Sequence, residues 1–115
     1  MNDSSDIKIW LDDERPSPKE YVHLKTVSEC IELLETGKVR HINFDHDLGT
    51  KLTGHDLALW IEKRAFEDSN FRVPSYAIQS ANIIGSRNIE STMKNARKVC
   101  SNPHPNLNCN EIILL

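Results

Sequence analysis

The chain has 115 residues, of which 38% are hydrophobic and 27% are charged, and its net charge is −3. This length predicts a single domain, residues 1–115, and the composition is ordinary for a soluble globular protein. The mildly negative charge excludes the broad basic surface with which proteins bind duplex DNA. No apolar run approaches the roughly 20 residues of a membrane span, so no membrane partner is expected.

The termini and cysteines indicate the cellular compartment. The N-terminal sequence MNDSSDIKIW is polar and acidic, unlike a secretory signal. Cys30, Cys100 and Cys109 are odd in number and lack C-x-x-C spacing, which favours free thiols in a reducing cytoplasm. Cys100, His104 and Cys109 are close enough in sequence to suggest zinc, but a fourth ligand is missing. The alternative is a polar C-terminal loop, residues 100–115, that leads into a last strand.

The first elements are two short strands with an unusual connection. Ile7–Leu11 is a nearly continuous apolar strand, and Val22–Lys25 reads as a second one. The ten residues between them include two prolines and are too few for an ordinary helical crossover. We therefore expect the first crossover helix to be missing or reduced, and the second strand to be an edge strand of undetermined direction.

Two helices begin with the same capping signal. Thr26 and Glu29, and likewise Thr53 and Asp56, have the spacing of a capping box. Apolar residues follow each pair at helical spacing, and Gly37 lies where the first helix would end. The apolar positions of the first helix are Val27, Cys30, Ile31 and Leu34, and those of the second are Leu57, Trp60, Ile61 and Ala65.

The remaining elements complete an alternating pattern. His41–Phe44 is the third predicted strand, Ser75–Gln79 the fourth and Glu111–Leu115 the fifth, with a third helix that starts near Gly85. Strands that alternate with helices predict an α/β fold. We expect a flavodoxin-like parallel sheet of four to five strands with helices on both faces.

Acidic residues follow two of the strands. Asp12 and Asp13 come after the first strand, and Asp45 and Asp47 after the third. In a flavodoxin-like order these strands are neighbours, so their carboxylates would converge and repel unless a cation neutralises them. Mg²⁺ or Mn²⁺ suits such ligands. The alternative is that these residues only form turns and helix caps.

Other polar residues at the same edge suit a phosphate. Ser80 and Asn82 follow the fourth strand and could donate hydrogen bonds to phosphate oxygens. Arg15 could bind the same oxygens, or could pair with Asp12 or Asp13. His46 is either a general acid or base, a metal ligand, or a packed or solvent-facing histidine.

The segments WLDDER, NFDHDLG, TGHDLALWIE and SAN..G together resemble the cyclic-phosphate-processing receiver family. This family is a divergent branch of the response-regulator receivers, found in bacteria and phages, and the resemblance covers about residues 7–93. It implies a receiver-like fold that acts on cyclic phosphates, either RNA ends or cyclic nucleotides, in a bacterial or phage-infected cytoplasm. By position, Asp12 and Asp13 match the metal-binding pair of receivers and Asp45 the phospho-accepting aspartate. Ser80 and Ala81 match the hydroxyl residue and the small residue that follow the fourth strand.

The chain also departs from ordinary receivers. The lysine that follows their fifth strand has no counterpart in EIILL, while His46 and Asp47 are additions. These differences favour hydrolysis, and we expect a metal-dependent phosphoesterase of small phosphate-bearing molecules or RNA ends. Asp12, Asp13 and Asp45 would hold the ion, and His46 or Asp47 would transfer the proton. Asp45 could alternatively act as a nucleophile.

Two other functions fit the same residues. One is a non-catalytic receiver-like module that binds a phosphorylated ligand or partner, and the other is a receiver that accepts phosphate from a small donor. The sequence does not determine the oligomeric state.

Overall fold

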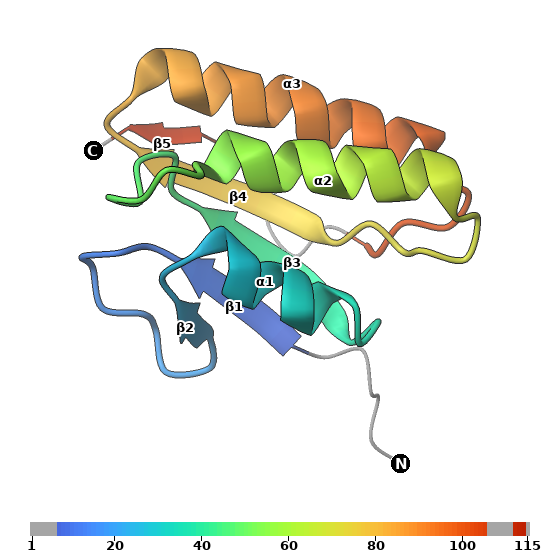
Figure 1. The fold of residues 1–115 in the computed structure, drawn as a ribbon, viewed down its shortest axis with the longest axis horizontal. Helices are drawn as coiled ribbons and strands as arrows, with labels where there is room; N and C mark the ends of the chain where they lie inside the picture. The colour runs from blue at the N-terminus through green and yellow to red at the C-terminus, as the bar shows by residue number, and fades with distance from the viewer. Residues whose placement is uncertain (1–6, 106–111, 115) are drawn as a thin grey trace.

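The computed structural model describes residues 7–105 and the backbone of residues 112–114. They form a five-stranded parallel sheet in the order β2-β1-β3-β4-β5, together with three helices (Figure 1). This confirms the predicted receiver-like α/β fold. The strands are β1 (Ile7–Leu11), β2 (Val22–Leu24), β3 (Val39–Phe44), β4 (Ser75–Ser80) and β5 (Ile112–Leu114), and the helices are α1 (Val27–Leu34), α2 (Gly54–Glu67) and α3 (Ile83–Val99).

The connection between β1 and β2 contains no helix, as its prolines and length suggested. It runs from Asp12 to Tyr21 as turns and extended chain. β2 pairs parallel to β1, with Ile9 opposite Val22 and Leu11 opposite Leu24. The direction of this edge strand, which the sequence left undetermined, is therefore parallel.

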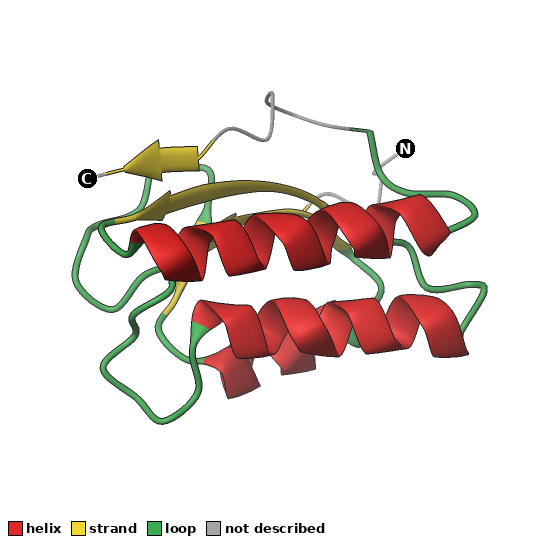
Figure 2. Ribbon diagram, turned by 90° about the horizontal axis from the view of Figure 1, so that it is seen from above, coloured by secondary structure: helices red, strands yellow, loops and turns green. Residues whose placement is uncertain are grey.

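All three helices cover one face of the sheet, which differs from the expectation of helices on both faces (Figure 2). Alternate strand residues pack against them, among them Ile9, Leu11, Ile42 and Phe44. A helix on the other face would have to lie in the β1–β2 connection or after β5. The first of these segments has no helix, so the described part of the chain leaves that face without one.

Aromatic and polar side chains occupy the helix-free face. Tyr21 packs edge-on against Trp10, with ring centroids 5.5 Å apart, and against His41 at 6.0 Å. The Lys8 ammonium lies 4.8 Å from the centre of the Tyr21 ring. His41 Nδ1 is 2.6 Å from the Ser75 hydroxyl oxygen. The segment that replaces the first helix thus packs a tyrosine on this face.

The helix starts follow their capping residues. Thr26 and Thr53 both form the predicted capping boxes, with Glu29 and Asp56. α3 begins at Ile83, two residues before the expected start, because the Asn82 side chain caps it. Among the described residues, no helix is both long and apolar enough to cross a membrane.

The segment after α3 is hydrogen-bonded to the loop that precedes β4. The Cys100 thiol donates to the carbonyl of Phe71 at 3.4 Å, and the His104 amide donates to the carbonyl of Val73 at 3.0 Å. Cys109, the third member of the possible zinc group, lies outside the described residues. The two described members have structural contacts in the loop.

Candidate functional site

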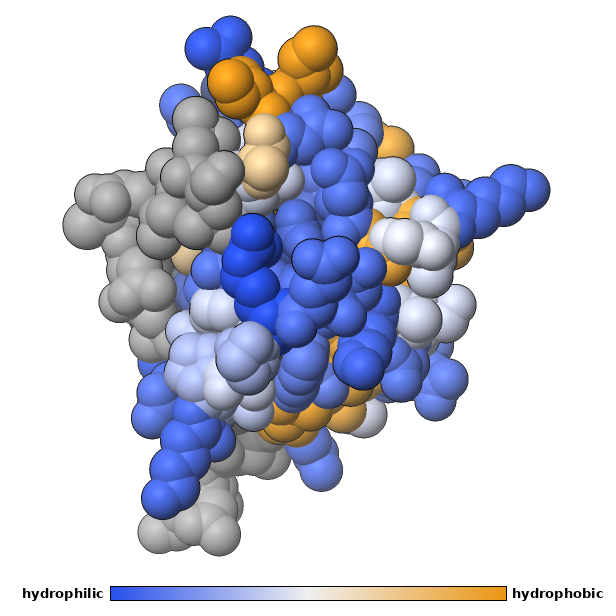
Figure 3. All heavy atoms as spheres, turned by 90° about the vertical axis from the view of Figure 1, so that its left-hand side faces the viewer, coloured by the Kyte–Doolittle hydropathy of each residue, from blue (hydrophilic) through white to orange (hydrophobic). Residues whose placement is uncertain are grey.

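The site lies where β1 and β3 end, at the carboxyl edge of the sheet. The strand pairing continues one residue beyond each strand: the Asp12 amide donates to the carbonyl of Leu24 at 3.2 Å, and the Asp45 amide donates to that of Leu11 at 3.0 Å. These bonds fix both aspartates side by side. Figure 3 views the molecule from this edge and shows hydrophilic residues at its centre.

Three carboxylates converge there. Asp12, Asp13 and Asp45 each offer an oxygen, and these oxygens lie within 4.8 Å of one another. Asp12 and Asp45 are buried, and Asp13 is half-buried. Oxygens on a divalent ion lie 2.0–2.6 Å from it, so one ion between them would satisfy all three. The donor set therefore fits the Mg²⁺ or Mn²⁺ that the sequence suggested.

The surroundings of Asp45 disfavour the ionised form of its carboxyl group. Burial, together with the neighbouring Asp12 carboxylate, raises the pKa of Asp45 to about 6. Hydrogen bonds from the Ser80 hydroxyl and the His46 amide, and the charge of Arg15, offset part of this rise. Without a cation, the native fold resists full ionisation of this residue.

Asp12 organises the loop that follows β1. One of its carboxylate oxygens accepts the amides of Glu14 and Arg15, at 2.8 and 2.9 Å. The other lies 3.3 Å from the Arg15 guanidinium. Of the two roles that the sequence left open for Arg15, the pairing with Asp12 is therefore present. Since this bond uses one of five N–H donors, the others can still meet an anion.

These residues surround an open cavity of about 270 Å³. Gly49 adopts a left-handed conformation with φ +66°, and a Cβ there would lie 3.0 Å from a carboxylate oxygen of Asp13. The loop after β3 thus returns close to the acidic group because it has a glycine there. The cavity is lined by Asp13, Glu14, Arg15, Asp45, Asp47, Gly49 and Ala81.

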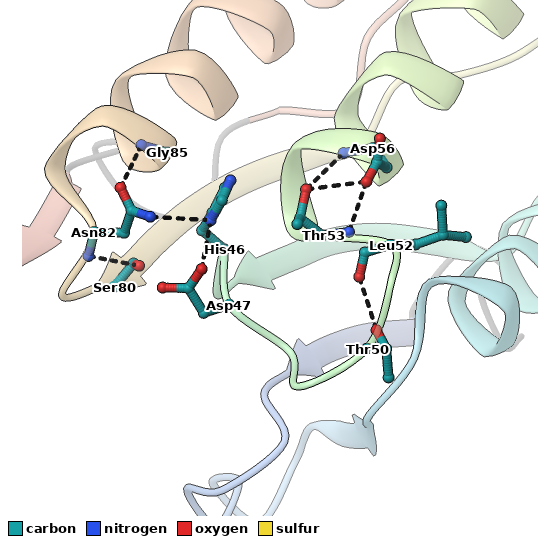
Figure 4. Close-up of polar contacts among 9 residues, drawn as sticks. All are labelled: His46, Asp47, Thr50, Leu52, Thr53, Asp56, Ser80, Asn82 and Gly85. Carbon is teal, nitrogen blue, oxygen red and sulfur yellow. Dashed lines mark hydrogen bonds and ion pairs between the residues drawn. The ribbon is translucent and has the colours of Figure 1, made fainter.

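His46 is not among the residues that line this cavity, but it contacts Asp47, which does line it. Figure 4 shows the His46 ring between the side chains of Asp47 and Asn82. Its Nδ1 lies 2.9 Å from a carboxylate oxygen of Asp47 and 3.4 Å from the amide nitrogen of Asn82. The Asp47 side chain is 65% exposed, whereas that of His46 is 17% exposed. His46 therefore reaches the cavity through Asp47.

Two glycines allow the close packing around His46. A Cβ on Gly85 would collide with the imidazole ring, and a Cβ on Gly54 would collide with the carbonyl oxygen of Asp45. The Gly54 amide also donates to the carbonyl of His46 at 3.0 Å. The first turns of α2 and α3 thus hold the loop after β3 from both sides.

Ser80 and Asn82 both make hydrogen bonds within the protein. The Ser80 hydroxyl is fully buried and bonds to Asp45, and its oxygen accepts the Asn82 amide at 3.1 Å. The Asn82 side-chain oxygen accepts the Gly85 amide at 2.8 Å. Through these bonds the two residues support Asp45, His46 and the start of α3, while their role in phosphate binding stays a prediction.

Sequence reasoning did not select several cavity residues. Glu14 belongs to the polar segment after β1, and Ala81 matches the small residue that follows the fourth strand in receivers, but neither was selected as a site residue. Gly85 does not line the cavity; it belongs to the SAN..G motif, and its role depends on the ring of His46, 39 positions earlier. Only the packing of α3 against the loop after β3 reveals it.

A parallel α/β sheet in this order, with acidic residues after its first and third strands, defines a receiver-like domain. The chain belongs to the cyclic-phosphate processing receiver domain family, whose model matches residues 7–95. This confirms the family suggested by the sequence motifs. No curated protein and no solved structure matches the chain.

Proposed function

We propose that the protein is a metal-dependent phosphoesterase that acts on cyclic phosphates. The observation that carries this proposal is the convergence of three carboxylates within 4.8 Å beside an open polar cavity. The family to which the chain belongs is named for cyclic-phosphate processing, which supports the choice of substrate. A receiver-like sheet with this pocket at its carboxyl edge follows the general placement of ligand sites in such folds.

Asp12, Asp13 and Asp45 would hold the ion. When bound, a divalent cation supplies positive charge that neutralises phosphate oxygens and favours ionisation of water. The residues themselves position the substrate: Arg15 lines the cavity and has guanidinium donors left for a non-bridging oxygen.

Asp47 is the proposed proton-transfer group. It lines the cavity, and its bond to His46 Nδ1 orients its carboxylate. In the reaction, water attacks phosphorus, one ring P–O bond breaks, and the leaving oxygen takes up a proton, which yields a phosphomonoester. His46 positions Asp47, because its ring contacts the Asp47 carboxylate without lining the cavity.

The test is hydrolysis of 2′,3′-cyclic and 3′,5′-cyclic nucleotides and of cyclic-phosphate-ended RNA in Mg²⁺, Mn²⁺ or EDTA. We expect metal-dependent product from the wild type and none from Asp45→Asn. Asp68→Asn, an aspartate at the end of α2, is the matched control and should retain activity. Tight binding of these compounds without product over a long incubation would contradict the proposal and favour a non-catalytic binding module.

A phospho-accepting receiver is the second candidate, because Asp45 ends β3 beside the Ser80 hydroxyl and the Asp12–Asp13 pair. Incubation with acetyl phosphate distinguishes it. A label on Asp45 that persists for minutes and is absent from Asp45→Asn would favour this function over hydrolysis.

A further inference from the structure

The outer face of α3 has an unusual charge for a protein with a net charge of −3. Its exposed side chains include Arg87, Lys94 and Lys98. Glu90 is the acidic residue of α3; it is half-buried and accepts a hydrogen bond from the Tyr76 hydroxyl at the sheet. The exposed side chains of this helix therefore include cations and no carboxylate, and the nearby Glu62 of α2 accepts a hydrogen bond from the Asn95 side chain at 2.7 Å.

These cations form a line along α3, whose first residue lies two positions after the cavity residue Ala81. Ile84, Arg87, Ser91, Lys94 and Lys98 follow one another at spacings of three and four residues, so they share one side of the helix. Figure 1 shows that α3 begins at the carboxyl edge of the sheet and runs to the opposite edge. Ala81, two residues before α3, lines the acidic cavity. The basic line thus leads directly away from the cavity.

The length of this line of cations favours a polymeric ligand over a mononucleotide. Arg87 and Lys98 are 11 residues apart, or about 16 Å at the rise of an α-helix. A mononucleotide with its phosphate in the cavity is too short to contact all three cations. A chain of phosphates can contact each in turn. Lys94 and Lys98 also border a shallow hollow of about 210 Å³ with Ser91 and Asn95.

Apolar residues lie between the cavity and the cations. Ile83 and Ile84 are 51% and 75% exposed, which is unusual for isoleucine. Figure 3 shows hydrophobic atoms at the margin of the hydrophilic centre. The flat face of a nucleobase next to a bound terminal phosphate could pack on these side chains, and this contact would not require a particular base.

We infer that the outer face of α3 binds the backbone of a single-stranded RNA whose cyclic-phosphate end lies in the acidic cavity. The inference names the substrate class of the proposed phosphoesterase and rests on that function for the position of the RNA end. RNA is the polymer concerned because a 2′,3′-cyclic phosphate requires the 2′-hydroxyl. Arg87, Lys94 and Lys98 would contact successive phosphates, and Ile83 and Ile84 the terminal base.

The test compares Lys94→Gln/Lys98→Gln with Lys19→Gln/Lys38→Gln, a control that removes the same charge from exposed lysines outside α3. Affinity for a short fluorescein-labelled single-stranded RNA is measured by anisotropy, in EDTA to prevent turnover, over a range of salt. Three phosphate contacts give a slope of log affinity against log salt of about −2, and loss of two contacts reduces it to about −0.7. The control should keep the wild-type slope.

Hydrolysis separates this inference from the proposed function. With cyclic-phosphate-ended RNA, the α3 variant should show a KM several-fold above that of the wild type, while its rates with a 2′,3′-cyclic mononucleotide stay unchanged. Equal RNA binding by the α3 variant, the control and the wild type would overturn the inference whatever the enzyme activity. Loss of RNA binding in the α3 variant alone, without hydrolysis of any substrate, would retain the binding surface and reject the phosphoesterase.

Discussion

Asp45 combines burial with a carboxylate that lies beside another carboxylate. It is 7% exposed, and its pKa is raised to about 6 by burial and by Asp12. At neutral pH the native state must therefore hold a carboxylate that it disfavours. A bound cation removes this cost, so stability and metal binding should be coupled.

Asp45→Asn should accordingly be more stable than the wild type at pH 7.5 in EDTA, by about 2 kcal/mol. The sign follows from the raised pKa of Asp45. Ionisation of Asp45 does not destabilise the native wild type below about pH 4, where the residue is protonated in both the folded and the unfolded state, and it destabilises it fully above about pH 6. Mg²⁺ should raise the Tm of the wild type and leave that of Asp45→Asn nearly unchanged. Thermal unfolding followed by circular dichroism tests both statements, and an equal Mg²⁺ shift in the two proteins would contradict the shared ion site.

His46 is held by contacts on several sides. Asp47 and Asn82 meet its Nδ1, and Gly85 leaves the space that its ring occupies. Gly85→Ala should destabilise the protein by about 1–3 kcal/mol, because a new Cβ meets the imidazole.

In a His46→Ala background the same Gly85→Ala substitution should be neutral or stabilising by up to about 1 kcal/mol, since alanine favours the helix and the ring is gone. Urea unfolding of the wild type, the two single variants and the double variant gives the coupling free energy between residues 46 and 85. If Gly85→Ala costs the same in both backgrounds, the ring does not set the requirement for glycine.

At the scale of elements, α2 connects the site to the rest of the fold. Its capping residue Thr53 accepts the Asp56 amide, and the Asp56 carboxylate accepts the Thr53 amide at 2.7 Å. The next residue, Gly54, contacts the backbone of Asp45 and His46. The start of this helix therefore determines where the loop after β3 lies.

Thr53→Ala should lower the free energy of unfolding by about 1 kcal/mol, because it leaves the Asp56 amide without its acceptor. Thr53→Ser keeps the hydroxyl and should lie close to the wild type. Urea denaturation measures both, and a similar loss in the serine variant would indicate that the methyl group matters rather than the cap.

Elements and their ends are predictable here where the signal is local. The capping boxes at Thr26 and Thr53 and the apolar runs of β1 and β4 depend on neighbouring residues alone, and the structure confirms them. The earlier start of α3 depends on whether Asn82 caps the helix or faces a ligand. The sequence pattern placed the start near Gly85, because it did not identify Asn82 as the capping residue.

The uncovered face of the sheet was not predictable by the same means. The prolines of the β1–β2 connection indicated a missing helix, but the general α/β pattern still suggested helices on both sides. Similarly, the convergence of Asp12 and Asp45 follows from strand order, whereas the direction of His46 depends on how the chain turns after β3. The order of the strands could be predicted from the sequence pattern. The direction of a side chain that follows a strand end could not.

At the scale of the whole molecule, the uncovered face makes stability sensitive to acid. His41 is fully buried there, and burial, with the charges of Lys8, Arg40 and Arg97, lowers its pKa to about 4. An unfolded histidine has a pKa near 6.5, so protonation between these values favours unfolding.

The free energy of unfolding should therefore fall by up to about 3 kcal/mol as the pH drops from about 6.5 to 4. Asp45 acts in the opposite sense between about pH 4 and 6, so the comparison is best made between Asp45→Asn and Asp45→Asn/His41→Asn. The first should lose stability across this range and the second should lose less. Urea titrations at several pH values provide the measurement, and parallel pH profiles would contradict this assignment to His41.

The sheet ends on both sides in a strand of three residues, β2 and β5, whereas its inner strands have five or six. An exposed strand edge can pair with a strand of another molecule, and a short edge offers few free amides and carbonyls for such pairing. Although one face of the sheet has no helix, the short edge strands disfavour aggregation through the sheet edges. Extension of β2 into the proline-containing loop is also hindered, because Pro16 and Pro18 have no amide hydrogen to donate.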